Sequence, residues 1–194
     1  MDPDAAAAVT AEGTTIRATV AGDLALLASI ERAAGRRFRQ VGLAAVADDE
    51  PPSLQAYRQA HQGERLWVAV LADEVVGYGW TEDLDGQPHL ERISVLPTAG
   101  GRGVGVALLR RVLGWAAGQD GARSLTLSTF RDVPWNGPWY RRLGFTDVDP
   151  SEVATHRRWR DLRAHEASCG LDIDARVIMR RQLVPTDHLP SKDP

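Results

Sequence analysis

Residues 95–106 decide the fold, and they read Val95-Leu96-Pro97-Thr98-Ala99-Gly100-Gly101-Arg102-Gly103-Val104-Gly105-Val106. An apolar run ends at Pro97, and an amphipathic pattern begins at Val104. Glycines let a backbone come close to a ligand because they carry no Cβ. The first turn of a helix has unpaired N–H groups and a partial positive charge, and Arg102 adds a full charge. The segment therefore predicts a strand, a phosphate-binding turn and a helix.

Several interpretations of this glycine-rich turn compete. A Walker loop needs Gly-Lys-Ser/Thr at its end, which this turn lacks. A dinucleotide-binding fingerprint needs G-x-G-x-x-G, but its third glycine falls on Leu108 or on Val106, depending on the glycine that starts the count. A coenzyme A pyrophosphate loop and a connector without a ligand both remain. The turn alone does not decide between them.

The rest of the chain alternates short strands with helices. Ahead of the glycine-rich turn, three apolar runs predict an antiparallel meander. The runs cover 66–71, 75–81 and 89–96, and turns at 72–74 and 83–88 separate them. The elements expected before the meander are a strand over 15–20 and helices over 24–34 and 54–61. Those expected after the turn are a helix from Val104 to Gly118, strands over 124–129, 145–148 and 176–183, and helices over 138–143 and 152–168.

Composition narrows the class of protein. The chain has 194 residues, 43% hydrophobic and 25% charged, with a formal net charge of −3. This is ordinary for a globular protein, whereas nucleic-acid-binding domains are more often strongly basic. Cys169 is the only cysteine, which excludes an intramolecular disulfide and a cysteine-based zinc site. No apolar run reaches the ~20 residues of a membrane span. We expect a cytoplasmic protein that binds no nucleic acid, membrane or metal.

A second segment completes a resemblance to a known family. Asn136, followed by Trp139-Tyr140-Arg141-Arg142-Leu143-Gly144-Phe145, is similar to the late Asn…Tyr-x-x-x-Gly-Phe motif of the GNAT superfamily of acetyl-CoA-dependent N-acetyltransferases. The glycine-rich turn is similar to that family's Arg/Gln-x-x-Gly-x-Gly/Ala motif, except that Gly100 stands where the family has Arg or Gln. The order of elements also matches. The resemblance implies an α/β GNAT fold, with a central, mostly antiparallel sheet that is flanked by helices and splayed around acetyl-CoA.

The resemblance also implies a domain organisation and a coenzyme site. We expect a disordered lead over 1–13, an N-acetyltransferase domain over 14–183 and a polar tail over 184–194. Acetyl-CoA would be the co-substrate, and its pyrophosphate would lie on the glycine-rich turn. The residues assigned to it are Ile93, Ser94, Val95, Gly100, Gly101, Arg102, Gly103, Val104, Gly105, Val106 and Asn136. A plain turn before Gly137-Pro138 explains Asn136 equally well.

Direct attack of an amine on the thioester needs a base, an acid and a donor to the carbonyl oxygen. Glu91 is the candidate base, because it lies on the third strand and shares a face with Ile93. His89 lies on the same face and is a rival, since an unperturbed histidine has a pKa of about 6.5. By resemblance, Tyr140 is the acid beside the coenzyme sulfur, with a core aromatic residue beside Phe145 as the alternative. Further rivals for the base are Glu82 and Asp83, and the carbonyl donor is expected to be a backbone N–H near Val95.

The acceptor is expected to be a primary amine of a small molecule, because no peptide-binding module is evident. The residues assigned to the acceptor are Phe38, Trp80, His89 and Trp135, although the tryptophans fit a core equally well. Two alternatives are acetylation of a protein or peptide N-terminus or lysine, and a coenzyme A-binding regulatory domain without turnover. The arginines over 152–168 are expected on a solvated helix face, with an anionic acceptor or partner as the alternative. A homodimer also stays open.

Overall fold

The computed structural model describes residues 8–9 and 13–183, which divide into two compact units. The first unit contains residues 8–9, 13–82 and 92–112, and the second contains 83–91 and 113–183. The expected tail over 184–194 lies outside the described residues. So does most of the expected lead, of which Ala8–Val9 form strand β1.

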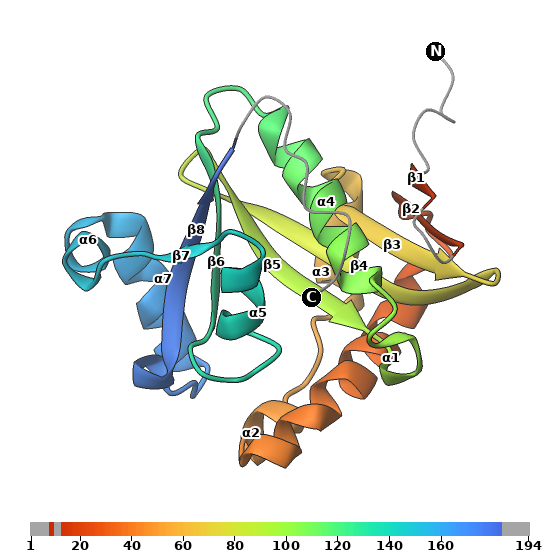
Figure 1. Cartoon of the computed structure of the whole chain (residues 1–194), viewed down its shortest axis with the longest axis horizontal. Helices are drawn as coiled ribbons and strands as arrows, with labels where there is room; N and C mark the ends of the chain where they lie inside the picture. The colour runs from red at the N-terminus through yellow and green to blue at the C-terminus, as the bar shows by residue number, and fades with distance from the viewer. Residues whose placement is uncertain (1–7, 10–12, 184–194) are drawn as a thin grey trace. The chain divides into compact units, whose positions relative to one another are not determined.

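The first unit has the strand order β1-β2-β3-β4-β5 (Figure 1). The pairs β1–β2, β2–β3 and β3–β4 are antiparallel. The strands are β1, β2 (Thr14–Ala18), β3 (Leu66–Leu71), β4 (Glu74–Leu84) and β5 (Gln87–Val95). The helices are α1 (Leu24–Gly35), α2 (Ala44–Ala47), α3 (Leu54–Gln62) and α4 (Val104–Ala117), with 3₁₀ turns η1 (Arg36–Val41) and η2 (Pro97–Ala99). The last residues of β4 and α4 and the first of β5 belong to the second unit.

Two tight turns set the meander from β3 to β5. Ala72 and Asp73, between β3 and β4, have φ of 49° and 63°. Asp85 and Gly86, between β4 and β5, have φ of 54° and 74°. Two-residue turns with positive φ at both positions match the right-handed twist of the paired strands. The three strands and both turns expected from the sequence are therefore confirmed.

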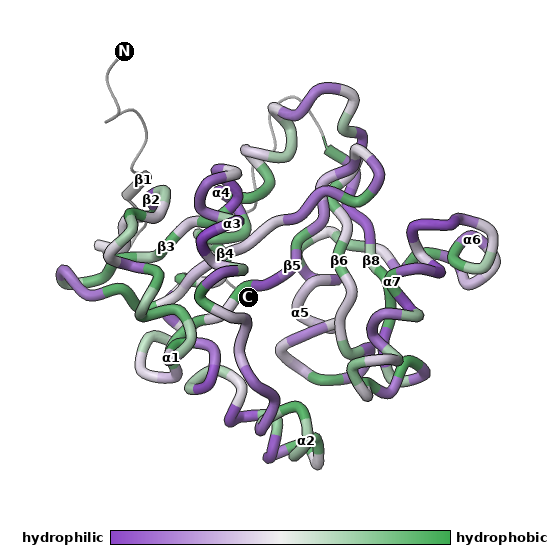
Figure 2. The backbone as a smooth tube through the Cα atoms, turned by 180° about the vertical axis from the view of Figure 1, so that it is seen from behind, coloured by the Kyte–Doolittle hydropathy of each residue, from purple (hydrophilic) through white to green (hydrophobic). Residues whose placement is uncertain are grey.

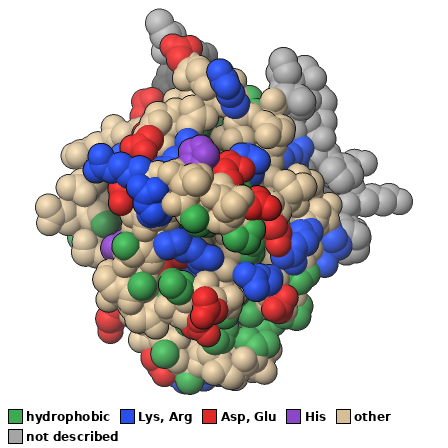
Figure 3. Space-filling view, turned by 90° about the vertical axis from the view of Figure 1, so that its left-hand side faces the viewer, with side chains coloured by type: hydrophobic (Ala, Val, Ile, Leu, Met, Phe, Trp, Pro, Cys, Tyr) green, Lys and Arg blue, Asp and Glu red, His purple; other side chains and the backbone are tan. Residues whose placement is uncertain are grey.

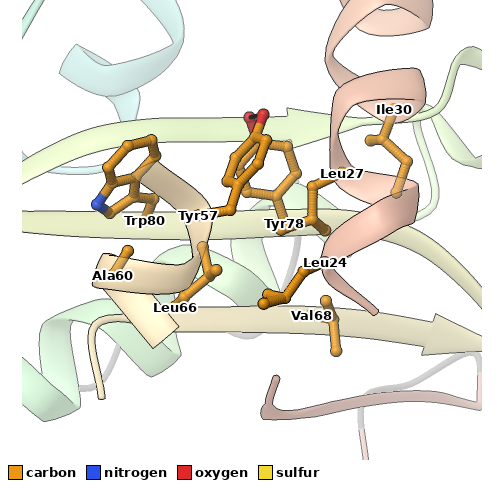
Figure 4. Close-up of a cluster of buried hydrophobic side chains, with 9 residues drawn as sticks. All are labelled: Leu24, Leu27, Ile30, Tyr57, Ala60, Leu66, Val68, Tyr78 and Trp80. Atoms are coloured by element: carbon orange, nitrogen blue, oxygen red, sulfur yellow. Dashed lines mark hydrogen bonds between the residues drawn. The ribbon is translucent and has the colours of Figure 1, made fainter. Parts of the chain in front are cut away.

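A buried apolar cluster holds α1 and α3 on β3 and β4 in the first unit (Figure 4). Figure 4 shows the ring of Tyr57, from α3, beside those of Tyr78 and Trp80 from β4. Tyr57 and Tyr78 are fully buried, as is Leu27 of α1. Burying a large apolar side chain contributes about 1.5–3 kcal/mol. The apolar positions that predict α1 thus form its contact with the sheet.

The second unit has the strand order β5-β6-β8-β7. Its strands after β5 are β6 (Ser124–Phe130), β7 (Thr146–Asp147) and β8 (Arg176–Gln182). Its helices are α5 (Gly137–Arg142), α6 (Pro150–Thr155) and α7 (Arg157–Ser168), and a 3₁₀ turn, η3 (Ile173–Ala175), precedes β8. β8 is antiparallel to β6 and β7, but β5 and β6 are parallel. The parallel ladder pairs His89 with Thr126 and Leu90 with Leu127, although β5 has nine residues. The expected α/β fold with a mostly antiparallel sheet flanked by helices is confirmed.

One expected helix is two helices. Residues 152–168 predict a single helix, but His156 has an extended backbone (φ −86°, ψ 124°) and separates α6 from α7. Figure 2 shows hydrophilic and hydrophobic residues mixed along α7. Trp159 is its buried anchor, packed with Val148 and Ile178. Among the helices of residues 13–183, none is both long and apolar enough to cross a bilayer.

Candidate functional site

The glycine-rich turn joins β5 to α4 in the first unit. Gly101 and Gly103 have φ of 71° and 75°, a conformation that other residues rarely adopt. A Cβ added at either glycine would meet no heavy atom within 4 Å, so the backbone conformation rather than crowding favours glycine. Ala107 N–H donates to the Gly103 carbonyl at 3.0 Å, and the N–H groups of residues 104–106 precede this first helical bond. The turn therefore has the arrangement that binds phosphate groups at helix N-termini.

The end of β5 is held tightly against β4. Leu96 N–H donates to the Val76 carbonyl at 2.8 Å. A Cβ added at Gly77 would lie 2.8 Å from the Ser94 carbonyl oxygen and 3.2 Å from Val95 Cγ2. Only glycine permits this close approach of the two strands. Ser94 is buried and Val95, like Ile93, is half-buried, so the residues that lead into the turn have a fixed position.

A carboxylate that the sequence did not single out lies beside this strand end. Glu31, on α1, accepts hydrogen bonds through Oε2 from the Ser94 hydroxyl and the Tyr78 hydroxyl, both at 2.5 Å. Its Oε1 accepts from the Arg92 guanidinium at 2.9 Å. The Glu31 side chain is 20% exposed. One carboxylate thus ties α1 to both β4 and β5.

The network continues into the core through a second tyrosine. The hydroxyls of Tyr57 and Tyr78 lie 3.2 Å apart. Because Tyr78 donates its single proton to Glu31, Tyr57 is the donor between them. Burial raises the pKa of Tyr78 well above 10, and the nearby Glu31 charge raises it further. Burial also raises the pKa of Tyr57. Both hydroxyls keep their protons, which the network requires.

The expected acceptor residues of the first unit have different surroundings. Trp80 is 8% exposed and belongs to the buried cluster. Its indole N–H donates to Glu82 Oε1 at 2.8 Å, and Glu82 Oε2 pairs with Arg65 at 2.6 Å. Phe38 is half-buried on η1. Trp80 is therefore a core residue whose indole N–H has a carboxylate partner, and its role at the acceptor stays a prediction.

Asn136 begins α5 in the second unit. Its backbone carbonyl accepts from Tyr140 N–H at 2.9 Å, and its Nδ2 donates to Thr129 Oγ1 at 2.7 Å. Its Oδ1 is buried and has no hydrogen-bond partner among the described residues. A buried amide oxygen without a donor is rare in folded proteins. The side chain therefore offers an acceptor for a ligand N–H.

Tyr140 packs between aromatic neighbours on α5. Its ring centroid lies 4.8 Å from that of Trp139 and 5.5 Å from that of Phe145, both with edge-on geometry. The side chain is 8% exposed. Gly137 lets α5 lie close to β6, because a Cβ there would come 2.3 Å from the Arg131 carbonyl oxygen. Packing therefore holds the segment from Asn136 to Tyr140 on both sides, and Trp135 before it is half-buried.

His89 and Glu91, the two candidate bases, have opposite surroundings in the second unit. His89 is 2% exposed, and its Nδ1 lies 2.9 Å from Thr126 Oγ1. Thr126 donates its proton to the Pro88 carbonyl at 3.2 Å, so His89 Nδ1 is the donor and Nε2 carries the lone pair. Burial, with the charges of Arg176 and Arg158, lowers the pKa of His89 to about 4. Glu91 is exposed.

Comparison with known proteins identifies the segment that holds these features. A model of the acetyltransferase (GNAT) domain family matches residues 62–147. Over this segment, which is less than half of the chain, the protein matches the GNAT acetyltransferases. The matched segment contains both the glycine-rich turn and the residues from Asn136 to Phe145, so the resemblance predicted from these two motifs is confirmed.

Proteins similar to this chain differ in their acceptors. The GCN5-like protein acetyltransferase Rv2170 from Mycobacterium tuberculosis is 44% identical over 62 residues, which are 31% of this chain and 29% of that protein. The chain thus spans less than a third of that relative. Among solved structures, the chain is similar to N-acetylglutamate synthase from Neisseria gonorrhoeae, complexed with coenzyme A and N-acetyl-glutamate. The TM-score is 0.63 and the sequence identity 19%, and the match covers 88% of this chain and 35% of the synthase chain. Rv2747 from Mycobacterium tuberculosis, in complex with CoA, has a TM-score of 0.63 at 20% identity, over 87% of this chain and 99% of its own.

The expected site residues divide between the two units. The glycine-rich turn, the end of β5, Phe38 and Trp80 belong to the first unit. His89, Glu91, Trp135, Asn136 and Tyr140 belong to the second. The Glu31 network was missed because its members are far apart in the sequence and each has an ordinary local role. A glutamate on the otherwise apolar face of α1 is the one signal that pointed to it.

Proposed function

We propose that this chain transfers the acetyl group of acetyl-CoA to a primary amine. The observation that carries the proposal is the glycine-rich turn, in which two left-handed glycines precede the N-terminus of a buried helix within the segment that matches the GNAT acetyltransferases. Bound there, acetyl-CoA supplies an activated acetyl thioester. Everything else that the reaction needs must come from side chains and backbone groups of this chain.

The residues present fit the coenzyme at two places. The N–H groups of residues 104–106 and the charge of Arg102 suit a pyrophosphate, since both stabilise anions. The unpartnered Oδ1 of Asn136 suits one of the amide N–H groups of pantetheine. This second match gives Asn136 a ligand contact in addition to its local bond with Thr129, so the alternative of a plain turn leaves its Oδ1 unexplained.

Three groups would handle charge and protons. The backbone N–H of Val95 would donate to the carbonyl oxygen as negative charge develops there. Tyr140 would hold a proton at its hydroxyl for the sulfur. Glu91 would accept the proton of the amine, directly or through water, because it is solvent-exposed. His89 is the weaker candidate, since a histidine whose pKa is about 4 is a poor proton acceptor at neutral pH.

The acceptor that we propose is a small-molecule amine. A protein amine is the second candidate, because the 44% identical relative from Mycobacterium tuberculosis is a protein acetyltransferase. One experiment distinguishes them. Purified chain and acetyl-CoA are incubated with a panel of small amines and with peptides bearing a free N-terminus or lysine, and release of free thiol is measured, with coenzyme A binding followed separately by calorimetry.

Each result has a defined meaning. Thiol release with small amines supports the proposal, whereas release with peptides alone moves the acceptor to proteins. Binding of coenzyme A without release for any amine or peptide would favour a regulatory domain. Absence of coenzyme A binding would overturn the proposed function as a whole.

A further inference from the structure

Arg158 and Trp159, neighbours on α7, have buried N–H groups without partners. The Arg158 guanidinium carbon lies 4.4 Å from the centre of the Trp159 ring, so the two side chains are stacked. Within the described part of the chain, neither Arg158 Nε nor Trp159 Nε1 has a hydrogen-bond partner, and both atoms are buried. Trp159 itself is fully buried. Two orphaned donors in one stacked pair are unusual, because a buried donor without an acceptor is destabilising.

Within the described residues, Arg158 also lacks a carboxylate partner, unlike other arginines of this unit. Glu166, 5% exposed, pairs with Arg176 at 2.9 Å and with Arg163 at 3.4 Å. Arg158 has no carboxylate partner among residues 13–183. Two guanidiniums therefore share the Glu166 carboxylate, and Arg158 adds a further positive charge on α7. Figure 3, which views the side that carries α6 and α7, shows arginines interspersed with acidic residues over that face.

This positive site lies near the start of β5. Trp159 lies in a buried cluster against which Leu84 packs, and Leu84 is the last residue of β4, three residues before β5 begins. Glu91 lies on that strand. Arg158, Trp159 and the proposed base Glu91 thus belong to the same unit of the protein.

We propose that Arg158 and Trp159 bind a carboxylate of the acceptor, so that the acceptor is an amino acid or a similarly short aminocarboxylate. This inference rests on the proposed acetyl transfer. Each orphaned N–H group can donate to a carboxylate oxygen, and the stacked guanidinium supplies the opposite charge. The carboxylate would satisfy both donors and pair with the Arg158 charge.

The first test compares matched acceptors. β-Alanine and β-alaninamide carry the same amine, but only the former carries a carboxylate. We expect wild-type kcat/KM to be at least about 10-fold higher for β-alanine, and we expect Arg158→Gln to abolish this preference. Arg157→Gln is the matched control on the same helix, because Arg157 is 84% exposed and pairs with Asp161. No preference in the wild type, or a preference that survives Arg158→Gln, would overturn the inference.

The second test needs no turnover. The indole N–H resonance of Trp159, assigned through Trp159→Phe, is followed by NMR while propionate or propionamide is added. We expect a saturable shift with propionate that propionamide does not cause and that Arg158→Gln removes. A shift without acetyl transfer to any amine would contradict the proposed function but would still support a carboxylate-binding site at Arg158 and Trp159. Equal responses to both probes, or none, would reject the site itself. A preference for O-phosphoethanolamine over β-alanine would mean that the site binds a phosphate group of the acceptor, which would also overturn the inference.

Discussion

The Tyr78 hydroxyl donates a 2.5 Å hydrogen bond to Glu31 Oε2, which joins β4 to α1. The same oxygen accepts from Ser94, the residue before Val95 on β5. The proposed carbonyl donor, the N–H of Val95, therefore belongs to a strand end that a single carboxylate positions. This relationship connects the packing of α1 with the chemistry proposed for β5.

Replacing Glu31 by Gln should destabilise the protein by about 1–3 kcal/mol, because the charge paired with Arg92 is lost and an amide has only one acceptor oxygen for three donors. Urea unfolding measures this change. The matched control is Glu50→Gln, since Glu50 is 85% exposed and pairs with Arg32 on the surface, where we expect less than about 0.5 kcal/mol. Equal effects of the two substitutions would show that the network contributes no special stability.

The buried tyrosines should resist ionisation in alkali. Burial raises the pKa of Tyr78 well above 10 and raises that of Tyr57. Their contribution to stability is therefore complete below about pH 10, the unfolded value, and is lost as the pH rises toward the folded values. Tyrosinate absorbance should show that both ionise together with unfolding, as reported by circular dichroism. Tyr78→Phe should remove one of these two tyrosines from the transition, and ionisation of both in the folded protein would contradict the expectation.

Stability should fall on acidification because of His89. Its folded pKa of about 4 lies below the ordinary 6.5, so between these values the unfolded chain binds a proton that the folded chain excludes. The full loss is on the order of 3 kcal/mol, since each pKa unit corresponds to about 1.4 kcal/mol. Unfolding free energies at about pH 7 and about pH 4.5 measure it. His89→Asn should weaken this dependence, and an identical loss in the variant would assign it to other groups.

Substituting Gly137 by Ala should displace α5. The added Cβ would lie 2.3 Å from the Arg131 carbonyl oxygen, which is backbone and cannot rotate away. We expect about 1–3 kcal/mol of destabilisation, measured by urea unfolding, and weaker coenzyme A binding through Asn136. Gly114→Ala is the control, because a Cβ at this exposed position of α4 meets nothing within 4 Å. It should stabilise by about 0.5–1 kcal/mol, since alanine favours a helix interior.

Tyr140→Phe tests the proposed acid. Phenylalanine preserves the ring contacts with Trp139 and Phe145 and removes only the hydroxyl. We expect kcat to fall roughly 10²-fold or more while the coenzyme A dissociation constant stays the same. Steady-state kinetics and calorimetry measure the two quantities. Unchanged kcat would make Tyr140 a packing residue only.

Much of the fold could be predicted because its determinants are local. The strand β3 has the predicted bounds Leu66–Leu71, and the Asp85-Gly86 turn is encoded by residues that tolerate positive φ. The glycine-rich turn and α4 follow from glycines and an apolar period within some twenty residues. The break at His156 was not predicted, because no glycine or proline marks it.

The sequence by itself determined the meander, the glycine-rich turn and the motif from Asn136 to Phe145, since each depends on neighbours a few residues apart. Only the tertiary structure decided which polar groups meet. Glu31 bonds with Arg92 and Ser94, 61 and 63 residues away, and His89 bonds with Thr126, 37 residues away. Such pairs form because strand register and helix packing bring distant backbone segments together, and no local pattern encodes that. The burial that lowers the pKa of His89 and leaves the Arg158–Trp159 donors unpartnered arises in the same way.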